Sequence, residues 1–189
     1  MKRTLNGAFT IMAHDPSITA WGWAIIDSQS NVVDMGCIKT EPNHKKNRIR
    51  KGDDSVRRLT EIANVICDTI KQHNVCCIVS ELPHGSQSAS AAIMIGAVTG
   101  LLTGLAVVSA VPIEWFSEAD SKKALLQKNS ATKQETIDAV TKILKVQWTG
   151  TKYKDEAIAD ALSVFHVASK QSSIIQYFLR NKSISSSLP

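Results

Sequence analysis

Residues 8–27 read AFTIMAHDPSITAWGWAIID. An apolar run ends at Asp15-Pro16, and after a short polar turn a second apolar run begins at Trp21. This pattern predicts a buried strand, a tight turn and an antiparallel return strand. The Asp15 carboxylate comes where the first strand leaves the core. It either caps the turn before Pro16 or, because desolvating a lone carboxylate is costly, is a metal ligand, the partner of a cation or a solvent-open strand end.

The composition is that of an ordinary globular protein. The 189 residues fit one domain, and 43% of them are hydrophobic and 21% charged. The net charge of +5 and the pI of about 9.1 favour a polyanionic partner. The N-terminus has no long apolar run of the kind a signal peptide needs. The cysteines lack CxxC or zinc-like spacing, which indicates reduced thiols and a cytoplasmic protein; they are Cys37, Cys67, Cys76 and Cys77.

One uncharged segment, residues 89–113, is long enough to cross a bilayer. Half of it is Ala, Gly, Ser or Thr, and Pro112 interrupts its end, so we expect a buried helix running into a strand and no membrane span. Gly96, Gly100 and Gly104 recur on one face of this helix. Such a stripe allows either tight packing within the chain or a homodimer seam.

The remaining pattern predicts a mixed sheet. Strands are expected at 9–13, 21–26, 31–40, 76–79 and 111–116, and helices at 53–72, 86–109, 132–145 and 155–170. Asp53 or Asp54, with Ser55, are candidates to cap the first helix. The segment 117–130 is expected to be a polar stretch. This order predicts an α/β fold, with an antiparallel meander followed by parallel strands, in one domain over residues 1–170; residues 171–189 are expected to form a partly disordered tail.

A basic segment, residues 41–52, follows the third predicted strand. It is either a solvated loop or, as the basic composition favours, an arm that contacts phosphates. Its cationic residues are Lys45, Lys46, Arg48, Arg50 and Lys51.

Acidic residues recur where the sheet and the last helix should meet. The central strand ends near Glu81, and the last helix begins with Asp155, Glu156 and Asp160. Glu156 and Asp160 lie about 40° apart on the helix, whereas Asp155 is about 140° from Asp160. Each acid alone could be an exposed surface group. Together they would repel one another unless Mg²⁺ or Mn²⁺ ions, two of them roughly 4 Å apart, lay between them, and oxygen-only ligands favour these hard cations over zinc.

Nearly the whole chain, from Phe9 to Ala168, resembles the RuvC-type Holliday junction resolvases, particularly their shorter phage-borne relatives. The resemblance depends on an ordered set of features: Asp15-Pro16 with Gly22, Gly36 to Thr40, Glu81 followed by Gly96 and Gly100, Lys122 to Lys133, and Ala159 to Leu162. It implies an RNase H-like fold with a mixed five-stranded sheet flanked by helices. It also implies a metal-dependent homodimeric endonuclease that makes paired nicks in four-way DNA junctions, in the host cytoplasm if phage-encoded.

The resemblance also implies roles for particular residues. Asp15, Glu81 and Asp160 match the family's metal-binding acids. The usual fourth acid is replaced by Ala157, so Glu156, with Asp155 as the alternative, is the expected substitute. Lys133 and Lys122 match lysines near the scissile phosphate. Together with the basic segment, the expected DNA contacts are His84, Lys122, Lys123, Lys128 and Lys133.

Two other functions fit the same residues. A related RNase H-like nuclease acting on flaps, RNA or RNA–DNA hybrids would keep the same acids. A non-catalytic junction-binding protein is the second alternative, and Ala157 is the feature that favours it.

Overall fold

A computed structural model gives the structure of residues 9–43, 48–128 and 130–180. The strands are β1 (Thr10–Asp15), β2 (Ala20–Asp27), β3 (Val32–Lys39), β4 (Val75–Leu82) and β5 (Ile113–Ser117). The helices are α2 (Lys51–Gln72), α3 (Ala89–Val108), α4 (Glu118–Leu126), α5 (Lys133–Ile143), α6 (Lys152–Gln171) and α7 (Ser173–Arg180).

The five strands form a single sheet in the order β3-β2-β1-β4-β5. The β1–β2 and β2–β3 pairs are antiparallel, whereas β4 is parallel to β1 and β5 is parallel to β4. The mixed sheet predicted from the sequence is therefore confirmed. Because β1 and β4 are parallel neighbours at its centre, their C-terminal ends lie at the same edge of the sheet.

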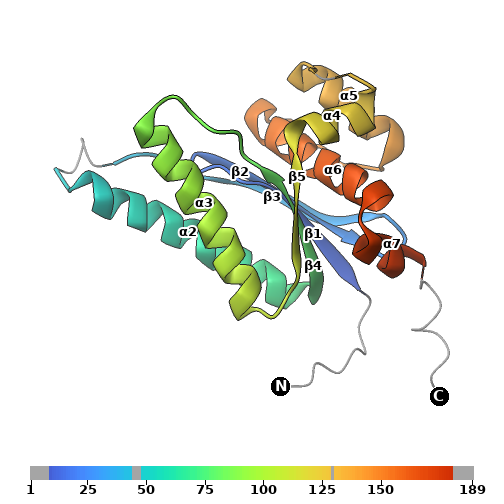
Figure 1. Cartoon of the computed structure of the whole chain (residues 1–189), viewed down its shortest axis with the longest axis horizontal. Coiled ribbons are helices and arrows are strands. Elements are labelled where there is room, and N and C mark those ends of the chain that lie inside the picture. The colour runs from blue at the N-terminus through green and yellow to red at the C-terminus, as the bar shows by residue number, and fades with distance from the viewer. Residues whose placement is uncertain (1–8, 44–47, 129, 181–189) are drawn as a thin grey trace.

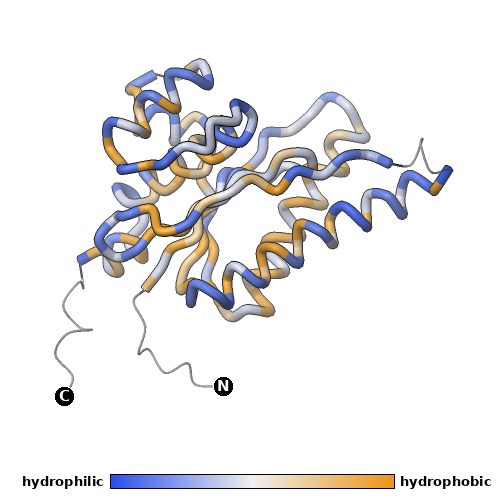
Figure 2. Tube along the Cα trace, turned by 180° about the vertical axis from the view of Figure 1, so that it is seen from behind, coloured by the Kyte–Doolittle hydropathy of each residue, from blue (hydrophilic) through white to orange (hydrophobic). Residues whose placement is uncertain are grey.

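Helices cover both faces of the sheet (Figure 1). On one face α2 and α3 pack against alternate strand residues, with Ile62 and Ile66 of α2 and Leu102 of α3 fully buried against residues such as Met12 and Ile25. Figure 2 shows the apolar strands at the centre and a striped α2, which has polar and apolar sides. This alternation is what a helix half-covered by a sheet requires.

On the opposite face, α6 lies against the sheet and is itself covered by α4, α5 and α7 (Figure 1). Its inward residues include Ile158, Leu162 and Phe165, which belong to the same buried cluster as Ile11 and Ala13 of β1. α6 therefore crosses the strands that carry the predicted acids, and this packing brings its first turns to the C-terminal end of β1.

The structure differs from the sequence-based expectations at three places. The segment after β5 is the helix α4, which is capped by the Ser117 side chain accepting a hydrogen bond from the Asp120 backbone. Within the expected tail, Ser173–Arg180 forms α7, and the buried Ile175 anchors it to the core. α2 begins at Lys51, before the expected caps, and its N-terminal neighbour makes no side-chain cap bond.

α3 differs further from the sequence-based expectation of a buried helix, because one of its apolar faces is exposed. Val98, Leu102 and Ala106 are buried, whereas Ile93 and Val107 on the other side are about two-thirds exposed or more, at 66% and 73%. Among the described helices, α3 alone has the length and apolar composition of a membrane span, and 17% of its most apolar window is buried.

Candidate active site

The position of Asp15 relative to α6 follows from a close backbone contact. Asp15 is opposite Gly22 in the β1–β2 ladder. A Cβ atom on Gly22 would lie 2.0 Å from the carbonyl oxygen of Ala157, so only glycine lets β2 approach α6 this closely. Asp160 follows Ala157 by three residues and is therefore on the same side of the helix. This explains physically why the sequence pairs Asp15 with a glycine seven residues later.

Glu81 joins this site through the parallel pairing of β1 and β4. His14 is opposite Ser80, so the next residues, Asp15 and Glu81, lie side by side at the C-terminal ends of their strands. Both are only partly exposed. Burial, followed by the negative charge of Asp160, raises the pKa of Asp15 to about 7. Burial, followed by the charges of Asp15 and Asp160, raises the pKa of Glu81 to about 8. The predicted convergence of these three acids is thus seen in the structure.

Lys133 is the cation inside this group. Its Nζ atom donates a hydrogen bond to Oδ2 of Asp160. Burial alone would lower the pKa of Lys133, but the bond to Asp160 and the charges of Asp15 and Glu81 outweigh it and raise this pKa. For the carboxyl group of Asp160 burial has the opposite effect and raises the pKa, although the hydrogen bond from Lys133 opposes this shift. Lys133 is the first residue of α5, and the preceding Thr132 caps the helix.

A fourth acid, Glu118, also acts on this site and was not identified from the sequence. It follows the last residue of β5, and Ser117 is opposite Leu82 of β4. Its charge contributes to the raised pKa of Asp15, Glu81 and Asp160. The signal that could have found it is the one that found Glu81: an acid directly after a predicted parallel strand, at the same edge of the sheet.

The two acids expected to replace the missing fourth ligand make other contacts. Both carboxylate oxygens of Asp155 accept hydrogen bonds from Thr149 and Gly150, which ties down the turn before α6. Glu156 lies 4.0 Å from Lys152, measured from its Oε1 atom to the lysine Nζ atom. Neither is among the charges that shift the pKa of the three central acids.

The remaining expected DNA contacts are on α4, at the start of α5 and in two loops. Lys122 is largely buried and bonds to Glu118, and its charge reaches Asp160. His84 is 3.1 Å from Glu118, measured from Nε2 to Oε2. Lys123 is exposed, and Lys128 bonds to Glu135 at 2.7 Å. Of these side chains, Lys122, His84 and Lys133 contact Glu118 or Asp160.

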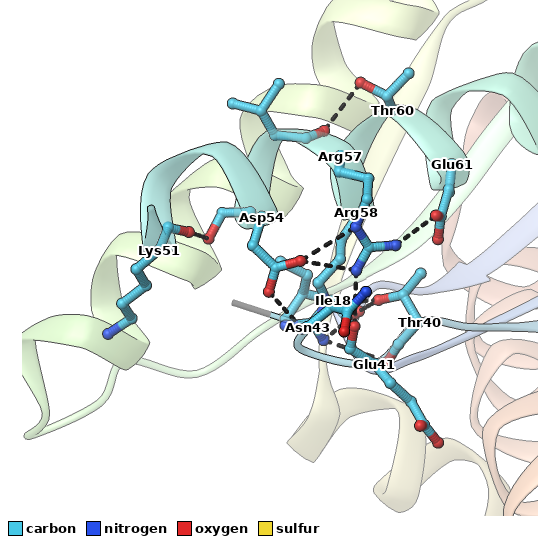
Figure 3. A network of polar contacts seen from close by, with 12 residues as sticks. Ile18, Thr40, Glu41, Asn43, Lys51, Asp54, Arg57, Arg58, Thr60 and Glu61 are labelled. Atoms are coloured by element: carbon cyan, nitrogen blue, oxygen red, sulfur yellow. Dashed lines mark hydrogen bonds and ion pairs between the residues drawn. The ribbon is translucent and has the colours of Figure 1, made fainter. Parts of the chain in front are cut away.

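The basic segment is only partly within the described residues. Lys45 and Lys46 lie outside them. Arg48 is exposed with a positive φ of 54°, Arg50 pairs with Asp53 at 2.6 Å, and Lys51 begins α2. The loop is held at its start, where the backbone N–H of Asn43 donates to the buried Asp54 at 2.8 Å and Arg57 binds the Glu41 carbonyl oxygen (Figure 3).

The turn that follows Asp15 is fixed by a buried arginine. Arg58 of α2 donates to the Thr40 hydroxyl at 2.8 Å, and its other contacts are the carbonyl oxygen of Ile18 at 3.0 Å and the hydroxyl of Thr19 at 3.2 Å (Figure 3). One guanidinium group thus ties the β1–β2 turn, the end of β3 and α2 together. This residue was not singled out from the sequence, although Arg58 lies four residues before Ile62 and therefore on the buried face of α2, which is the signal that could have found it.

The chemistry of the donor set fits a hard divalent cation. Three carboxylates that are mostly buried lie near the Lys133 ammonium group, and burial first, with the charges of neighbouring acids second, raises their pKa values. Within the described ranges, no three Asp, Glu, His or Cys side chains are already close enough together to coordinate one metal ion, and Asp160 is hydrogen-bonded to Lys133. Asp15, Glu81 and Asp160 are the residues that would hold an ion here.

The mixed five-stranded sheet with helices on both faces has the RNase H-like fold. Carboxylates at the ends of two neighbouring strands and on the helix that crosses them are the site expected of a nuclease with this fold. A family model described as crossover junction endodeoxyribonuclease RuvC matches residues 11–167. The chain belongs to this RuvC family.

Curated relatives and solved structures agree with this membership. The RuvC protein of Nitratidesulfovibrio vulgaris strain Hildenborough is 25% identical over 161 residues, covering 84% of this chain and 91% of that protein. That of Protochlamydia amoebophila is 28% identical over 169 residues, covering 86% and 92%. The structure of T. thermophilus RuvC in complex with a Holliday junction substrate matches with a TM-score of 0.69 at 18% identity, covering 85% of this chain and 92% of that one. The yeast mitochondrial Holliday junction resolvase matches with a TM-score of 0.57 at 10% identity, covering 91% and 80%.

Proposed function

We propose that this chain is a divalent-metal-dependent DNA endonuclease that resolves four-way junctions by paired nicks in the cytoplasm. The observation that carries the proposal is the grouping of Asp15, Glu81 and Asp160 at one edge of the sheet, with Lys133 among them. Family membership supports the junction as substrate, and the net charge of +5 suits a polyanion.

The residues at the sheet edge would hold Mg²⁺ or Mn²⁺, two ions per site in this proposal. When bound, such ions supply a nucleophilic water and stabilise the leaving oxygen. Asp15, Glu81 and Asp160 hold this charge at the scissile phosphate. Lys133 first, and Lys122 second, stabilise negative charge on the non-bridging phosphate oxygens. Glu156, with Asp155 as the alternative, stays a prediction for the fourth ligand, which Glu156→Gln and Asp155→Asn test separately through metal affinity.

The DNA would cross the face that carries α4 and α5 and continue toward the basic segment. Lys122, Lys133 and His84 contact acids of the site, Lys123 and Lys128 are on and just after α4, and Arg48, Arg50 and Lys51 lie at or just before the start of α2. Each lysine or arginine on a phosphate releases about one counterion, so removing one of them should reduce the slope of affinity against salt by about 1.

The exposed face of α3 supports a homodimer. Cβ atoms built on Gly96, Gly100 and Gly104 would meet nothing within 4 Å, so this chain alone does not need glycine at these positions. Glycine inside a helix costs about 1 kcal/mol relative to alanine, and a second helix backbone packed on the stripe would justify it. Ile93 and Val107 are exposed on the same face. At the N-terminal end of α3 a hollow of about 700 Å³, lined by residues such as Val56 and Met94, extends the apolar surface onto α2.

The dimer is tested by filling this stripe. Gly100→Leu should convert the dimer into a monomer in sedimentation without detergent, because the side chain enters the space a partner backbone would occupy. The monomer should remain folded and be as stable or more stable, since leucine is a better helix former. Lys71→Leu, on α2, is a control outside the seam. A wild-type monomer at micromolar concentration, or an aggregate that only detergent disperses, would contradict the proposal.

The activity is tested with three substrates: a synthetic four-way junction, a flap and an RNA–DNA hybrid, each with Mg²⁺ or EDTA. We expect paired nicks in the junction with Mg²⁺ only, and junction binding without cleavage for Asp15→Asn. Preferential cutting of the flap or hybrid would favour the broader nuclease. Tight junction binding without any cleavage by the wild type would identify a binding protein instead. Undiminished cutting by Asp15→Asn would remove Asp15 from the site.

A further inference from the structure

Glu118 lies between two residues with proposed DNA contacts. Its Oε1 atom accepts a hydrogen bond from Nζ of Lys122, one helical turn along α4, and its Oε2 atom is 3.1 Å from Nε2 of His84. His84 lies in the loop that follows β4, three residues after Glu81. One carboxylate thus joins the first turn of α4 to the loop beside the acids.

These contacts restrict Lys122 more than the other lysines around the site. Lys122 is 20% exposed, whereas Lys128 is 56% exposed and bonds away from the acids to Glu135. A free lysine side chain loses rotamer entropy when it is fixed on a ligand. Because Glu118 already holds the ammonium group where its charge reaches Asp160, part of this ordering is complete before DNA arrives.

We propose that Glu118 is a positioning residue of the cleavage site, which holds Lys122, and with it His84, in place for the scissile phosphate. This inference rests on the proposed nuclease function and adds a residue to it. Glu118 acts through Lys122 and does not itself touch the reacting phosphate. The alternative role is that of any acid in the first turn of a helix, which stabilises the helix through its dipole.

The proposal predicts effects of opposite sign on binding and on cleavage. The Glu118 charge repels DNA, so Glu118→Gln should bind the junction as tightly as the wild type or more tightly. Its single-turnover cleavage rate at saturating protein should nevertheless fall about tenfold, because Lys122 is no longer held. Glu118→Asp, which keeps the charge but shortens the side chain, should recover part of the rate.

A double-mutant cycle separates positioning from a structural role. If Glu118 acts through Lys122, Glu118→Gln in a Lys122→Ala background should change the cleavage rate less than twofold. Asp120→Asn is the matched control. It removes an acid from the same helical turn, whose contacts are with the capping residue Ser117, and it should leave the rate within about twofold. Multiplicative effects in the double variant, or equal losses of binding and cleavage in Glu118→Gln, would overturn the proposal.

A second measurement needs no cleavage and therefore distinguishes failure of this inference from failure of the proposed function. Acetylation of lysines followed by mass spectrometry should modify Lys122 several-fold more slowly than Lys123 in the wild type. In Glu118→Gln the Lys122 rate should rise several-fold while the Lys123 rate is unchanged. Equal rates for the two lysines in the wild type would show that Glu118 does not hold Lys122. Absence of junction cleavage by the wild type with Mg²⁺ would instead contradict the function.

Discussion

The ammonium group of Lys133 donates a hydrogen bond to the Oδ2 atom of Asp160, at the point where the three acids meet. Lys133 is 57% exposed and Asp160 only 11%, so the lysine reaches inward from the surface to a nearly buried carboxylate. A divalent cation held by Asp160 would compete with this bond. Binding of the ion would then release the ammonium group toward a phosphate, which connects metal binding to the position of Lys133.

Replacing Lys133 by methionine should therefore have two measurable effects. Without the ammonium group the acids repel one another more strongly, so the metal-free protein should unfold at a lower temperature and Mg²⁺ should raise that temperature more than in the wild type. Cleavage should fall by at least tenfold because a cation near the phosphate is lost. Lys142→Met, which removes an exposed lysine farther along α5, is the control. Unchanged metal stabilisation would show that Lys133 and the ion do not share Asp160.

Stability of the metal-free protein should fall as the pH rises. The pKa values of Asp15 and Glu81 are raised from 3.8 to about 7 and from 4.5 to about 8, so the folded state holds these protons more tightly than the unfolded chain. The stabilisation is complete below about pH 4 and is lost as the pH passes through 7 and 8. Thermal unfolding in EDTA between pH 5.5 and 8.5 measures it.

Asp15→Asn serves as the reference for that measurement, since other groups titrate in both proteins alike. The variant should gain stability relative to the wild type as the pH rises in EDTA, and lose this advantage with saturating Mg²⁺. A difference between the two proteins that does not depend on pH would contradict the raised pKa of Asp15.

Much of the fold could be predicted because its elements follow local patterns. The apolar strands around Asp15 and Glu81 and the helical period of α6 are visible in the sequence, and parallel pairing then requires the acids to meet. α4 and α7 were missed for a different reason. α4 is short and polar and depends on the Ser117 cap, and α7 is stabilised mainly by burying residues such as Ile175 in a core that the sequence does not display.

The site was predictable to the same extent. Asp15, Glu81 and Asp160 could be placed because strand ends and helix faces determine them. The positions of Glu118 and Arg58 also carry such signals, but their roles could not be predicted, because these depend on tertiary partners: Lys122 and His84 for one, Ile18 and Thr40 for the other. A helix-face argument favoured Glu156, but an angle on a helix does not say which neighbour the side chain meets, and here that neighbour is Lys152.

Gly22→Ala should disrupt both stability and activity. The added methyl group would lie 2.0 Å from the backbone carbonyl oxygen of Ala157. Because this neighbour is a backbone atom and not a flexible side chain, the clash can be relieved only by moving α6 away from β2. We expect a loss of about 3 kcal/mol in the free energy of unfolding and a strong loss of cleavage, because Asp160 moves with α6. Gly52→Ala, on α2 and outside the glycine stripe of α3, adds a methyl group that meets nothing within 4 Å and should be neutral or stabilising in urea unfolding. Equal stability of the two variants would contradict the close contact.

Arg58→Met should loosen the turn after Asp15 while leaving the acids themselves intact. The substitution keeps the apolar stem in place but removes the guanidinium donor from the Ile18 carbonyl oxygen and the Thr40 hydroxyl, which stay bonded to each other, and losing hydrogen bonds from a charged group costs about 1.5–3 kcal/mol. We expect unfolding in urea at about 2 kcal/mol lower free energy, and weaker Mg²⁺ binding in calorimetry because Asp15 is less firmly held. Arg57→Met, one residue earlier and mainly bonded to Asp54, Glu61 and the Glu41 carbonyl, is the matched control and should affect stability without weakening Mg²⁺ binding. If both variants weakened Mg²⁺ binding equally, general softening of α2 would be the cause, and Arg58 would have no particular role in holding Asp15.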